Sequence, residues 1–401
     1  MIKPHKACYL LLLFLLCCKK PYNPPAITGN GSYLVVEGAI NRGPDSTKIK
    51  LSRTVNVSSD TATNPVLHAL VSVESDQNVS YPLTETTNGN YVSVGLNLDN
   101  SRTYRLSIKT PDNKQFQSDF VSVSITPPID SVGFSIVNDP VAGIQIYANA
   151  HDQTNTVKYY RWDYSEAWEF HSKFISYYIS NGTTLALRTQ AQDVSTCYTN
   201  DVSSDIVLGS TAKLKQDVIY QSPIVFIAST SEKIEAGYSI LLHQYALTAD
   251  AYNFWISLKK NTEQLGSIFD AQPSQLAGNI HCITNPSEPV IGYISVCTVS
   301  SKRIFIPSSQ LPSWIPTYPY TCSKPYCCPI AQCPPRGFCI DTVDLGSNSF
   351  HGLLINQSNV NVDDGPLPVN GDELPGYFFV VPRQCGDCTI RGSITPPPFW
   401  P

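Results

Sequence analysis

The stretch Tyr159-Tyr-Arg-Trp-Asp-Tyr-Ser-Glu-Ala-Trp-Glu-Phe170 has large aromatic residues at alternate positions, interrupted only by Glu166. A period of two is typical of a β-strand, because alternate side chains point to the same face of a sheet. The aromatic residues expected on one face are Trp162, Tyr164, Trp168 and Phe170. Such a row most often fills the core between two sheets, and the alternative is a stacking surface for a sugar or another flat ligand. The stretch therefore predicts that this part of the chain is a sheet.

Composition indicates an exported β-rich protein with more than one domain. The chain has 401 residues, which is more than the roughly 250–300 at which a single core usually stops growing. Charged residues make up 15% against a usual value of about 25%, and 31 prolines and 22 tyrosines accompany long stretches rich in Ser, Thr and Asn. The net charge of −5 leaves no basic surface for nucleic acid, so DNA or RNA binding is not expected.

Residues 32–126 are predicted to form an immunoglobulin-like β-sandwich. Thr103–Lys109 alternates cleanly, with Tyr104, Leu106 and Ile108 on one face. The domain has the immunoglobulin scale of short strands but lacks the Cys, Trp, Cys pattern of antibody domains. The strand-like runs, separated by Asn, Gly, Asp and Pro turn signals, are 33–40, 47–52, 67–74, 91–96, 104–109 and 116–123.

A larger β-rich domain is predicted for residues 127–401. The boundary falls in Ile125-Thr-Pro-Pro-Ile129, because neither proline can extend a central strand. Strand-like runs follow at 131–137, 143–148, 293–299 and 303–306. One helix is expected near 249–262, with Thr248 as its N-cap and its apolar residues packed on a sheet.

The N-terminus has the pattern of a bacterial lipoprotein signal peptide over residues 1–17. Lys3 and Lys6 precede an apolar run of about 10 residues, too short for the roughly 20 that span a bilayer. Cleavage before Cys18 places small Cys17 at −1, whereas cleavage before Cys17 would place bulky Leu16 there. We therefore expect Cys18 to carry the lipid and residues 18–31 to form a tether; an ordinary secretory signal or a short N-terminal anchor is the alternative.

The remaining cysteines favour disulfides, which suits an extracytoplasmic compartment. Five of the ten lie in the Pro-rich loop 322–339, whose spacing lacks the paired knuckles and histidines of most zinc sites. Cys385-Gly-Asp-Cys388 lies outside any βαβ pattern, so a local disulfide is expected there rather than a redox centre. The disulfide candidates are Cys197, Cys282, Cys297, Cys322, Cys327, Cys328, Cys333, Cys339, Cys385 and Cys388.

Motifs of catalysis and of bound cofactors are absent from the sequence. G-x-S-x-G, H-E-x-x-H, G-x-x-x-x-G-K and G-x-G-x-x-G do not occur. His151-Asp152 is the one adjacent His/Asp pair, and its turn-like surroundings favour a solvated loop. Residues 359–365 approach a calcium loop, but the glycine comes one place late and Asn370 replaces the bidentate Glu. With Asp372 and Glu373 this loop is a candidate for bound calcium, and no other metal or cofactor is expected.

Several segments resemble one known family. They are the stretch from Ala251 to Asp270, with the pieces Tyr160-Arg-Trp162, Trp168-Glu-Phe170 and Cys385-Gly-Asp-Cys388. In these the chain is similar to the domain-of-unknown-function 4249 family of Bacteroidota lipoproteins. The resemblance implies an exported, lipid-anchored, mostly β protein, often encoded beside outer-membrane TonB-dependent transporters and without an established activity.

The expected function follows from the anchor, the absent motifs and the resemblance. It is that of a non-catalytic lipoprotein of the outer membrane, an accessory or ligand-binding partner of a TonB-dependent transporter. The alternatives are a stand-alone binding, adhesive or structural envelope lipoprotein, and a hydrolase whose site is assembled only in three dimensions. Surface lipoproteins of that phylum often carry acidic residues after the lipidated cysteine, whereas this chain has Lys19-Lys20, so both the periplasmic and the cell-surface face stay open.

Overall fold

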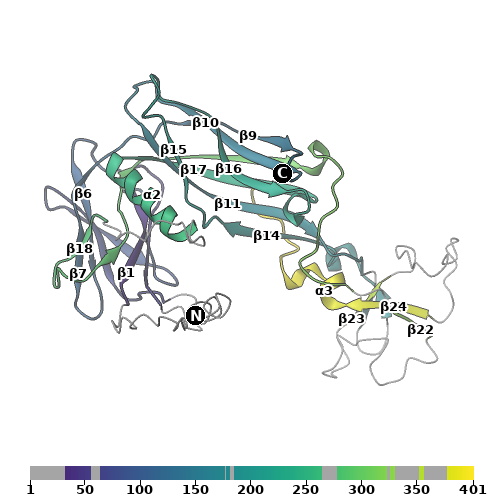
Figure 1. Ribbon diagram of the computed structural model, residues 1–401. Helices are drawn as coiled ribbons and strands as arrows, with labels where there is room; N and C mark the ends of the chain where they lie inside the picture. The colour runs from purple at the N-terminus through teal and green to yellow at the C-terminus, as the bar shows by residue number, and fades with distance from the viewer. Residues whose placement is uncertain are drawn as a thin grey trace, which may run out of the picture.

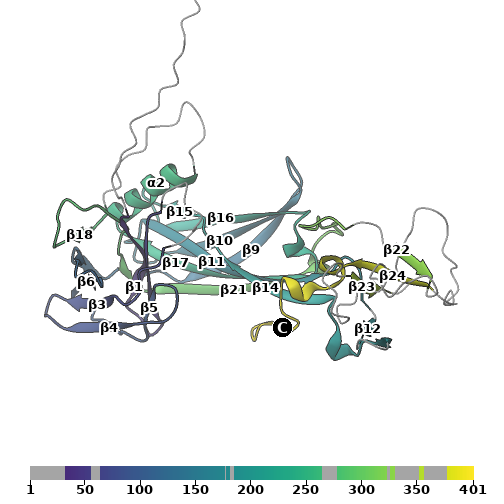
Figure 2. The same cartoon turned by 90° about the horizontal axis from the view of Figure 1, so that it is seen from below.

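The computed structural model is mostly β, as the sequence predicts, with two hydrophobic cores. Figures 1 and 2 show a smaller domain at one end, long sheets in the middle and a small sheet at the other end. The predicted signal peptide, Cys18 and the tether lie outside the described residues. The structure describes residues 32–55, 64–176, 178–180, 185–263, 278–322, 326–329, 352–355 and 377–401.

The first domain is a sandwich whose strands form one continuous, folded-over path. The order of neighbours along this path is β18-β7-β6-β3-β4-β5-β2-β1-β19, with β8 and β20 attached to β6 and β1. Eight strands come from the expected N-terminal domain: β1 (Leu34–Asn41), β2 (Thr47–Arg53), β3 (Leu70–Ser75), β4 (Ser80–Glu85), β5 (Asn90–Ser93), β6 (Thr103–Lys109), β7 (Gln115–Ser118) and β8 (Val121–Ser122).

Local sequence accounts for much of this sandwich. Tyr104, Leu106 and Ile108 on β6 are each at most 1% exposed, which confirms the predicted alternation. Asn88 and Gly89 both have positive φ, 52° and 73°, between β4 and β5. Two central residues with positive φ define the tight hairpin turn that Asn-Gly favours.

The first domain is completed by a segment that returns from the second. The added strands are β18 (Ile280–Cys282), β19 (Val290–Ile291) and β20 (Val296–Cys297). β18 pairs with β7, while β19 and β20 pair in parallel with β1. Ile280, Ile294 and Val296 lie in the first core. The expected continuous division at residue 126 is therefore wrong, because the first core needs apolar residues that the sequence places inside the second domain.

The returning segment is tied together by close backbone contact and by one buried amide. A Cβ on Gly278 would lie 1.9 Å from the carbonyl oxygen of Gly292, so the two backbones touch where only glycine fits. Asn279 Oδ1 accepts from the backbone N–H of Ile294 at 2.8 Å, and Asn279 Nδ2 donates to the Ile294 carbonyl at 2.9 Å. Asn279 therefore supplies hydrogen bonds that a regular ladder would otherwise make.

The second domain packs a five-stranded sheet on a three-stranded one. β11 and β17 form the centre of the larger sheet, in the order β14-β11-β17-β21 with β15 also on β11, and the smaller sheet has the order β16-β10-β9. The strands are β9 (Ile129–Val137), β10 (Gly143–His151), β11 (Tyr159–His171), β14 (Thr196–Val202), β15 (Val207–Ser210), β16 (Val218–Ala228), β17 (Gly237–Leu247) and β21 (Val299–Pro307).

The aromatic row of β11 lies between these two sheets. Trp162 and Phe170 are fully buried, and Tyr164 and Trp168 are only 5% and 8% exposed. All four belong to the second core, so the packing interpretation holds. The alternative of a ligand-stacking surface is wrong for these residues, because the opposing sheet covers their faces.

The larger sheet holds the segment that links the two domains. Gln244 on β17 is fully buried, accepts from the indole N–H of Trp162 at 2.9 Å and donates to the Pro127 carbonyl at 2.9 Å.

Helix α2 (Ala249–Glu263) follows β17 and lies over the junction of the two domains in both views (Figures 1 and 2). Thr248 Oγ1 accepts from Ala251 N at 3.2 Å, which confirms the predicted N-cap.

The C-terminal part returns to the outer face of the larger sheet. Trp400 contacts Tyr198 and Phe305 edge to face, and the Arg303 guanidinium lies 3.6 Å from the Phe399 ring centroid. The remaining elements are β12 (Tyr178–Ser180), β13 (Leu185–Leu187), β22 (Tyr326–Pro329), β23 (Gly352–Ile355), β24 (Tyr377–Pro382), α3 (Arg383–Gly386) and four short 3₁₀ turns at 190–192, 232–234, 308–310 and 388–390. Of these strands, β12 pairs with β13, and β24 lies between β22 and β23.

Replacing Asn279 tests the role of the returning segment. Asn279→Ala leaves a buried backbone N–H and carbonyl of Ile294 without partners, and each such loss costs about 1–3 kcal/mol. We expect a clear fall in the urea midpoint of the first domain. Asn285→Ala is the matched control, because Asn285 is exposed and the one side-chain hydrogen bond it makes within the described chain is from the Ser287 hydroxyl, so its effect should stay within about 0.5 kcal/mol. Equal effects of the two variants would contradict the structural role of Asn279.

Candidate functional site

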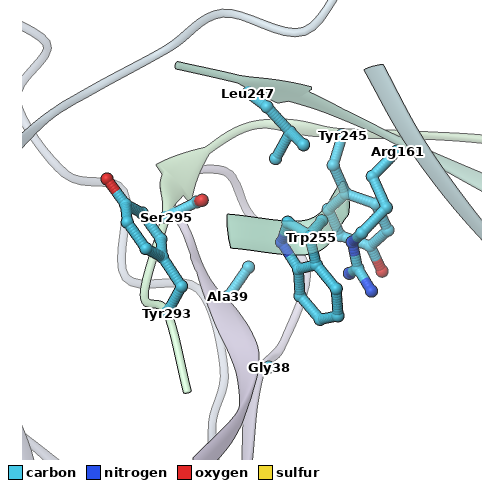
Figure 3. A pocket seen from close by; sticks show the side chains of 8 residues that line it. All are labelled: Gly38, Ala39, Arg161, Tyr245, Leu247, Trp255, Tyr293 and Ser295. Carbon is cyan, nitrogen blue, oxygen red and sulfur yellow. The ribbon is translucent and has the colours of Figure 1, made fainter. Parts of the chain in front are cut away.

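A shallow hollow lies where the two domains and helix α2 meet, and we call it the interdomain hollow (Figure 3). It has a volume of about 200 Å³, counting space open to solvent. Junctions between domains are common places for small-molecule sites. The residues that line it come from β1, β11, β17, α2 and the returning segment: Gly38, Ala39, Arg161, Tyr245, Leu247, Trp255, Tyr293 and Ser295.

The Arg161 guanidinium is held between two aromatic rings in this hollow. Its central carbon lies 4.4 Å from the Tyr245 ring centroid and 4.6 Å from that of Trp255. Arg161 and Tyr245 are direct neighbours across β11 and β17, whereas Trp255 comes from α2. Stacking of a planar cation on aromatic faces is favourable and fixes its orientation. The side chain stays only 15% exposed.

Helix α2 is positioned by further ring contacts, so Trp255 is fixed as well. Tyr252 stacks on Tyr159 of β11 with centroids 4.7 Å apart, and Phe254 lies 5.6 Å from Tyr293 of the returning segment. The helix therefore contacts both the larger sheet and the segment that completes the first domain.

Asp163 lies beside Arg161 on the same face of β11 and is part of a small charged network. Arg161 Nη2 donates to Asp163 Oδ2 at 3.2 Å, while His243 Nδ1 and the Tyr245 hydroxyl lie 3.0 Å and 3.3 Å from Asp163 Oδ1. Burial would raise the pKa of Asp163, but the His243 hydrogen bond and the Arg161 charge outweigh it and hold the pKa below its ordinary value. Asp163 is therefore a carboxylate at neutral pH.

Cys297 is a buried thiol near the same network. Burial raises the pKa of this thiol to about 12, although the Arg161 charge and a hydrogen bond with Thr126 oppose part of the rise. Because the thiolate is the nucleophilic form, Cys297 is not a reactive group at neutral pH.

A row of Asp, His and Ser crosses three neighbouring strands of the larger sheet. Asp163 on β11 faces His243 on β17, and His243 faces Ser301 on β21. Residues opposite each other on adjacent strands have Cβ atoms about 4.5–5.5 Å apart. A hydrogen bond joins Asp163 to His243, but none joins His243 to Ser301 in the described part of the chain. These are the residue types of a nucleophilic triad in an incomplete arrangement.

Sequence reasoning did not find the interdomain hollow. Arg161 belongs to the aromatic stretch 159–170, yet its side chain lies on the opposite face of β11 from the aromatic row. The other residues that line the hollow are far from Arg161 in sequence and follow no fixed spacing. Among them are Tyr245, Trp255, Tyr293 and Ser295. The one available signal was a cation at an outward position of a strand that is otherwise aromatic.

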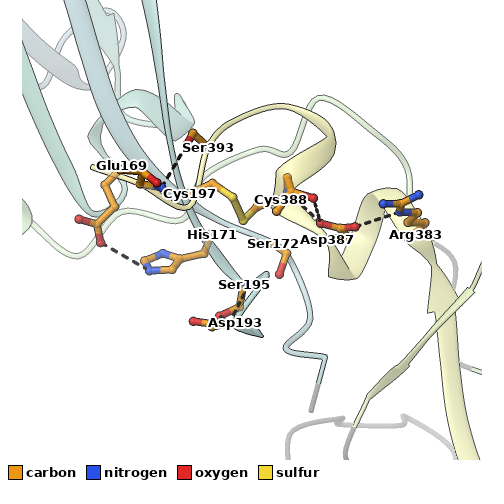
Figure 4. Close-up of a disulfide and its surroundings, with 12 residues drawn as sticks. Glu169, His171, Ser172, Asp193, Ser195, Cys197, Arg383, Asp387, Cys388 and Ser393 are labelled. Carbon is orange, nitrogen blue, oxygen red and sulfur yellow. Dashed lines mark hydrogen bonds and ion pairs between the residues drawn. A yellow bond between two sulfur atoms is a disulfide. The ribbon is translucent and has the colours of Figure 1, made fainter. Parts of the chain in front are cut away.

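Four of the disulfide candidates form two long-range bonds. Cys197 on β14 bonds to Cys388, with Cα atoms 5.7 Å apart, and Cys322 bonds to Cys385, with Cα atoms 5.8 Å apart. The expected local bond between Cys385 and Cys388 is therefore wrong, because each sulfur meets a cysteine from another segment. Figure 4 shows Asp387 beside the first bond, where it accepts from Arg383 Nε at 2.9 Å.

Two other candidates are free, buried thiols. Cys282 lies in the first core and Cys297 at the domain junction. The disulfide interpretation is wrong for both, because each sulfur has a threonine hydroxyl rather than a second sulfur beside it: Thr284 for Cys282 and Thr126 for Cys297. The side chains of Cys327, Cys328, Cys333 and Cys339 lie outside the described residues, and so does the candidate calcium loop from Asn359 to Glu373.

The His151-Asp152 pair is a structural loop, as expected. His151 Nδ1 lies 2.7 Å from Asp130 Oδ2, so its partner is not Asp152. Asp152 instead accepts from the backbone N–H groups of Thr154, Thr156 and Val157. Burial opposes these bonds, but together they hold the pKa of Asp152 far below its ordinary value.

The described residues contain neither a metal-binding cluster nor a membrane-spanning helix. No group of three or more His, Cys, Asp or Glu side chains in that part of the chain has an arrangement that could hold a metal ion. Among the helices that the structure describes, none is both long and apolar enough to cross a membrane.

Comparison with protein families gives one match, to the family described as "Domain of unknown function (DUF4249)", over residues 19–303. The chain belongs to the DUF4249 family. The matched residues begin directly after Cys18 and end within β21, so they include every residue of the interdomain hollow. Cys322, Cys385 and Cys388 lie beyond the match. None of the curated proteins that were compared matches the chain.

Peptide mapping tests the disulfide arrangement of this DUF4249 protein. Digestion of the oxidised, purified chain without reduction should yield a peptide with Cys197 linked to Cys388 and one with Cys322 linked to Cys385. Alkylation of the native chain should leave Cys282 and Cys297 unmodified, because both thiols are buried, and both should react after unfolding. A peptide with Cys385 linked to Cys388 would contradict the structure.

Proposed function

We propose that this DUF4249 protein is a lipid-anchored, non-catalytic protein of the outer membrane that works beside a TonB-dependent transporter. It binds a ligand and presents it to the transporter, or it covers the barrel. The proposal combines the predicted anchor at Cys18, the family membership and the geometry of the interdomain hollow.

Two separate features support a location outside the cytoplasm and a lipid anchor at Cys18. The family match begins at Lys19, the residue after the predicted lipidated cysteine. Disulfides that join distant segments are typical of proteins outside the cytoplasm.

The observation that carries the proposal is the fixed cation in the interdomain hollow. Arg161 is oriented by two rings before any ligand arrives, and a preorganised group loses little freedom on binding. The hollow is lined by both domains and by α2, so a ligand there contacts all three parts of the molecule. This arrangement suits recognition more directly than bond making.

Co-purification tests the transporter partnership. The tagged full chain, produced in its own cells and extracted in mild detergent, is expected to bring a TonB-dependent transporter with it. Cys18→Ser should lose membrane anchoring and the transporter, while the matched control Cys17→Ser should keep both. Recovery of the wild-type chain alone, under conditions that preserve an established transporter complex, would contradict the proposal and favour a stand-alone envelope lipoprotein.

A hydrolase is the second candidate function, and the row Asp163, His243 and Ser301 is the observation that favours it. A substrate that brought Ser301 into hydrogen-bond distance of His243 would complete a nucleophile, a base and an orienting carboxylate.

Ester hydrolysis separates the two functions. A hydrolase predicts turnover of short p-nitrophenyl esters that falls by at least about 10²-fold in Ser301→Ala and in His243→Gln. The exposed Ser131→Ala on β9 is the control and should leave that rate unchanged. Our proposal predicts the same background rate for wild type and all three variants, so a rate that depends on Ser301 would contradict it.

A further inference from the structure

We propose that the interdomain hollow binds the carboxylate of a small organic acid, and that Arg161 is the residue that recognises it. This inference rests on the ligand-binding role proposed above for the same site. It adds the chemical class of the ligand and the group that selects it.

The position of the Arg161 guanidinium directs a ligand to its edge. The rings of Tyr245 and Trp255 both lie against the cation, whose central carbon is 4.4 Å and 4.6 Å from their centroids. Hydrogen-bond partners can then approach only in the guanidinium plane, where its N–H groups form the fork that matches a carboxylate.

Most of the donors on that edge are available. A guanidinium has five N–H groups, and Asp163 Oδ2 is the hydrogen-bond partner of Nη2 at 3.2 Å. Within the described chain, Arg161 has no other hydrogen-bond partner. Arg161 is not the sole partner of the Asp163 carboxylate, because its other oxygen, Oδ1, hydrogen-bonds with His243 and accepts from the Tyr245 hydroxyl.

Charge in the hollow favours a carboxylate over a more highly charged anion. Arg161 is the one positively charged residue that lines it, and Asp163 lies beside Arg161. Asp163 repels every anion here, but it repels a phosphate dianion about twice as strongly as a carboxylate, and the hollow has no second cation to offset that repulsion.

The rest of the lining suits a small, partly polar body. Ser295 brings a hydroxyl group that makes no hydrogen bond within the described residues, and Tyr293, Ala39 and Leu247 bring apolar surface. The enclosed part of the hollow is only about water-sized and the rest is open to solvent, so a carboxylate group can lie against Arg161 while the body of the ligand stays outside. Both an acidic sugar and the C-terminal carboxylate of a peptide have this chemistry.

Calorimetry with matched acid and neutral pairs tests the inference on the purified, oxidised chain carrying Cys18→Ser. The probes are D-galacturonate against D-galactose, and N-acetyl-L-alanine against N-acetyl-L-alaninamide. At least one acid should bind, with its neutral counterpart at least about tenfold weaker, because the neutral probe lacks the charged partner of Arg161. Which acid binds identifies the source of the carboxylate.

Variants assign the binding to Arg161. Arg161→Gln should weaken the acid at least about tenfold, and Arg161→Lys should restore only part of the loss, because it keeps the charge but not the planar fork. Arg303→Gln is the matched control, since Arg303 lies on β21 of the same sheet and also stacks on an aromatic ring, that of Phe399, but is outside the hollow. Its affinity should equal that of wild type.

Three outcomes would overturn the inference: no binding of either acid at millimolar concentration, equal binding of acid and neutral probes, or equal loss in Arg161→Gln and Arg303→Gln. The first two need only the chain with Arg161 intact, so poor folding of a variant cannot obscure them. The measurement contains no transporter, and co-purification needs no added acid. Failure of the carboxylate inference therefore leaves the transporter partnership separately testable.

Discussion

Strand β1 pairs in parallel with β19 and β20, which come from a part of the chain beyond helix α2. This pairing is the constraint on which the arrangement of the molecule depends. It requires the chain to leave the second domain, complete the first core with Ile280, Ile294 and Val296, and return as β21. The chain therefore passes between the two domains three times instead of once: after residue 126, between α2 and β18, and between β20 and β21.

The interdomain hollow is a direct consequence of the return of residues 278–298 to the first domain. β1 contributes Gly38 and Ala39, the returning segment contributes Tyr293 and Ser295, and the larger sheet contributes Arg161. Helix α2 closes the arrangement by placing Trp255 over the guanidinium. A site assembled from so many segments exists only when both domains are folded and correctly seated.

The C-terminal part stabilises the opposite end of the larger sheet. Cys388 is bonded to Cys197 on β14, Arg391 lies over the Phe170 ring and pairs with Glu232, and Trp400 packs against Phe305. Cys388 and Arg391 thus contact the core-facing side of the sheet, at Cys197 and Phe170, whereas Trp400 contacts its outer side at Phe305. The segment is therefore held around the end of the sheet. Asp163, His243 and Ser301 lie on the outer face, and none of the three is buried.

The sequence alone is enough to predict the buried aromatic face of β11, the alternation in β6 and the capped helix after Thr248. It also carries the resemblance to the DUF4249 family. These features depend on residues close together in the chain, where periodicity and turn chemistry act. Tertiary structure alone decided the return of residues 278–298, the partners of Cys385 and Cys388, and the aromatic contacts of Arg161. Each of these joins residues far apart in sequence, and only the packing of complete sheets brings such residues within contact distance.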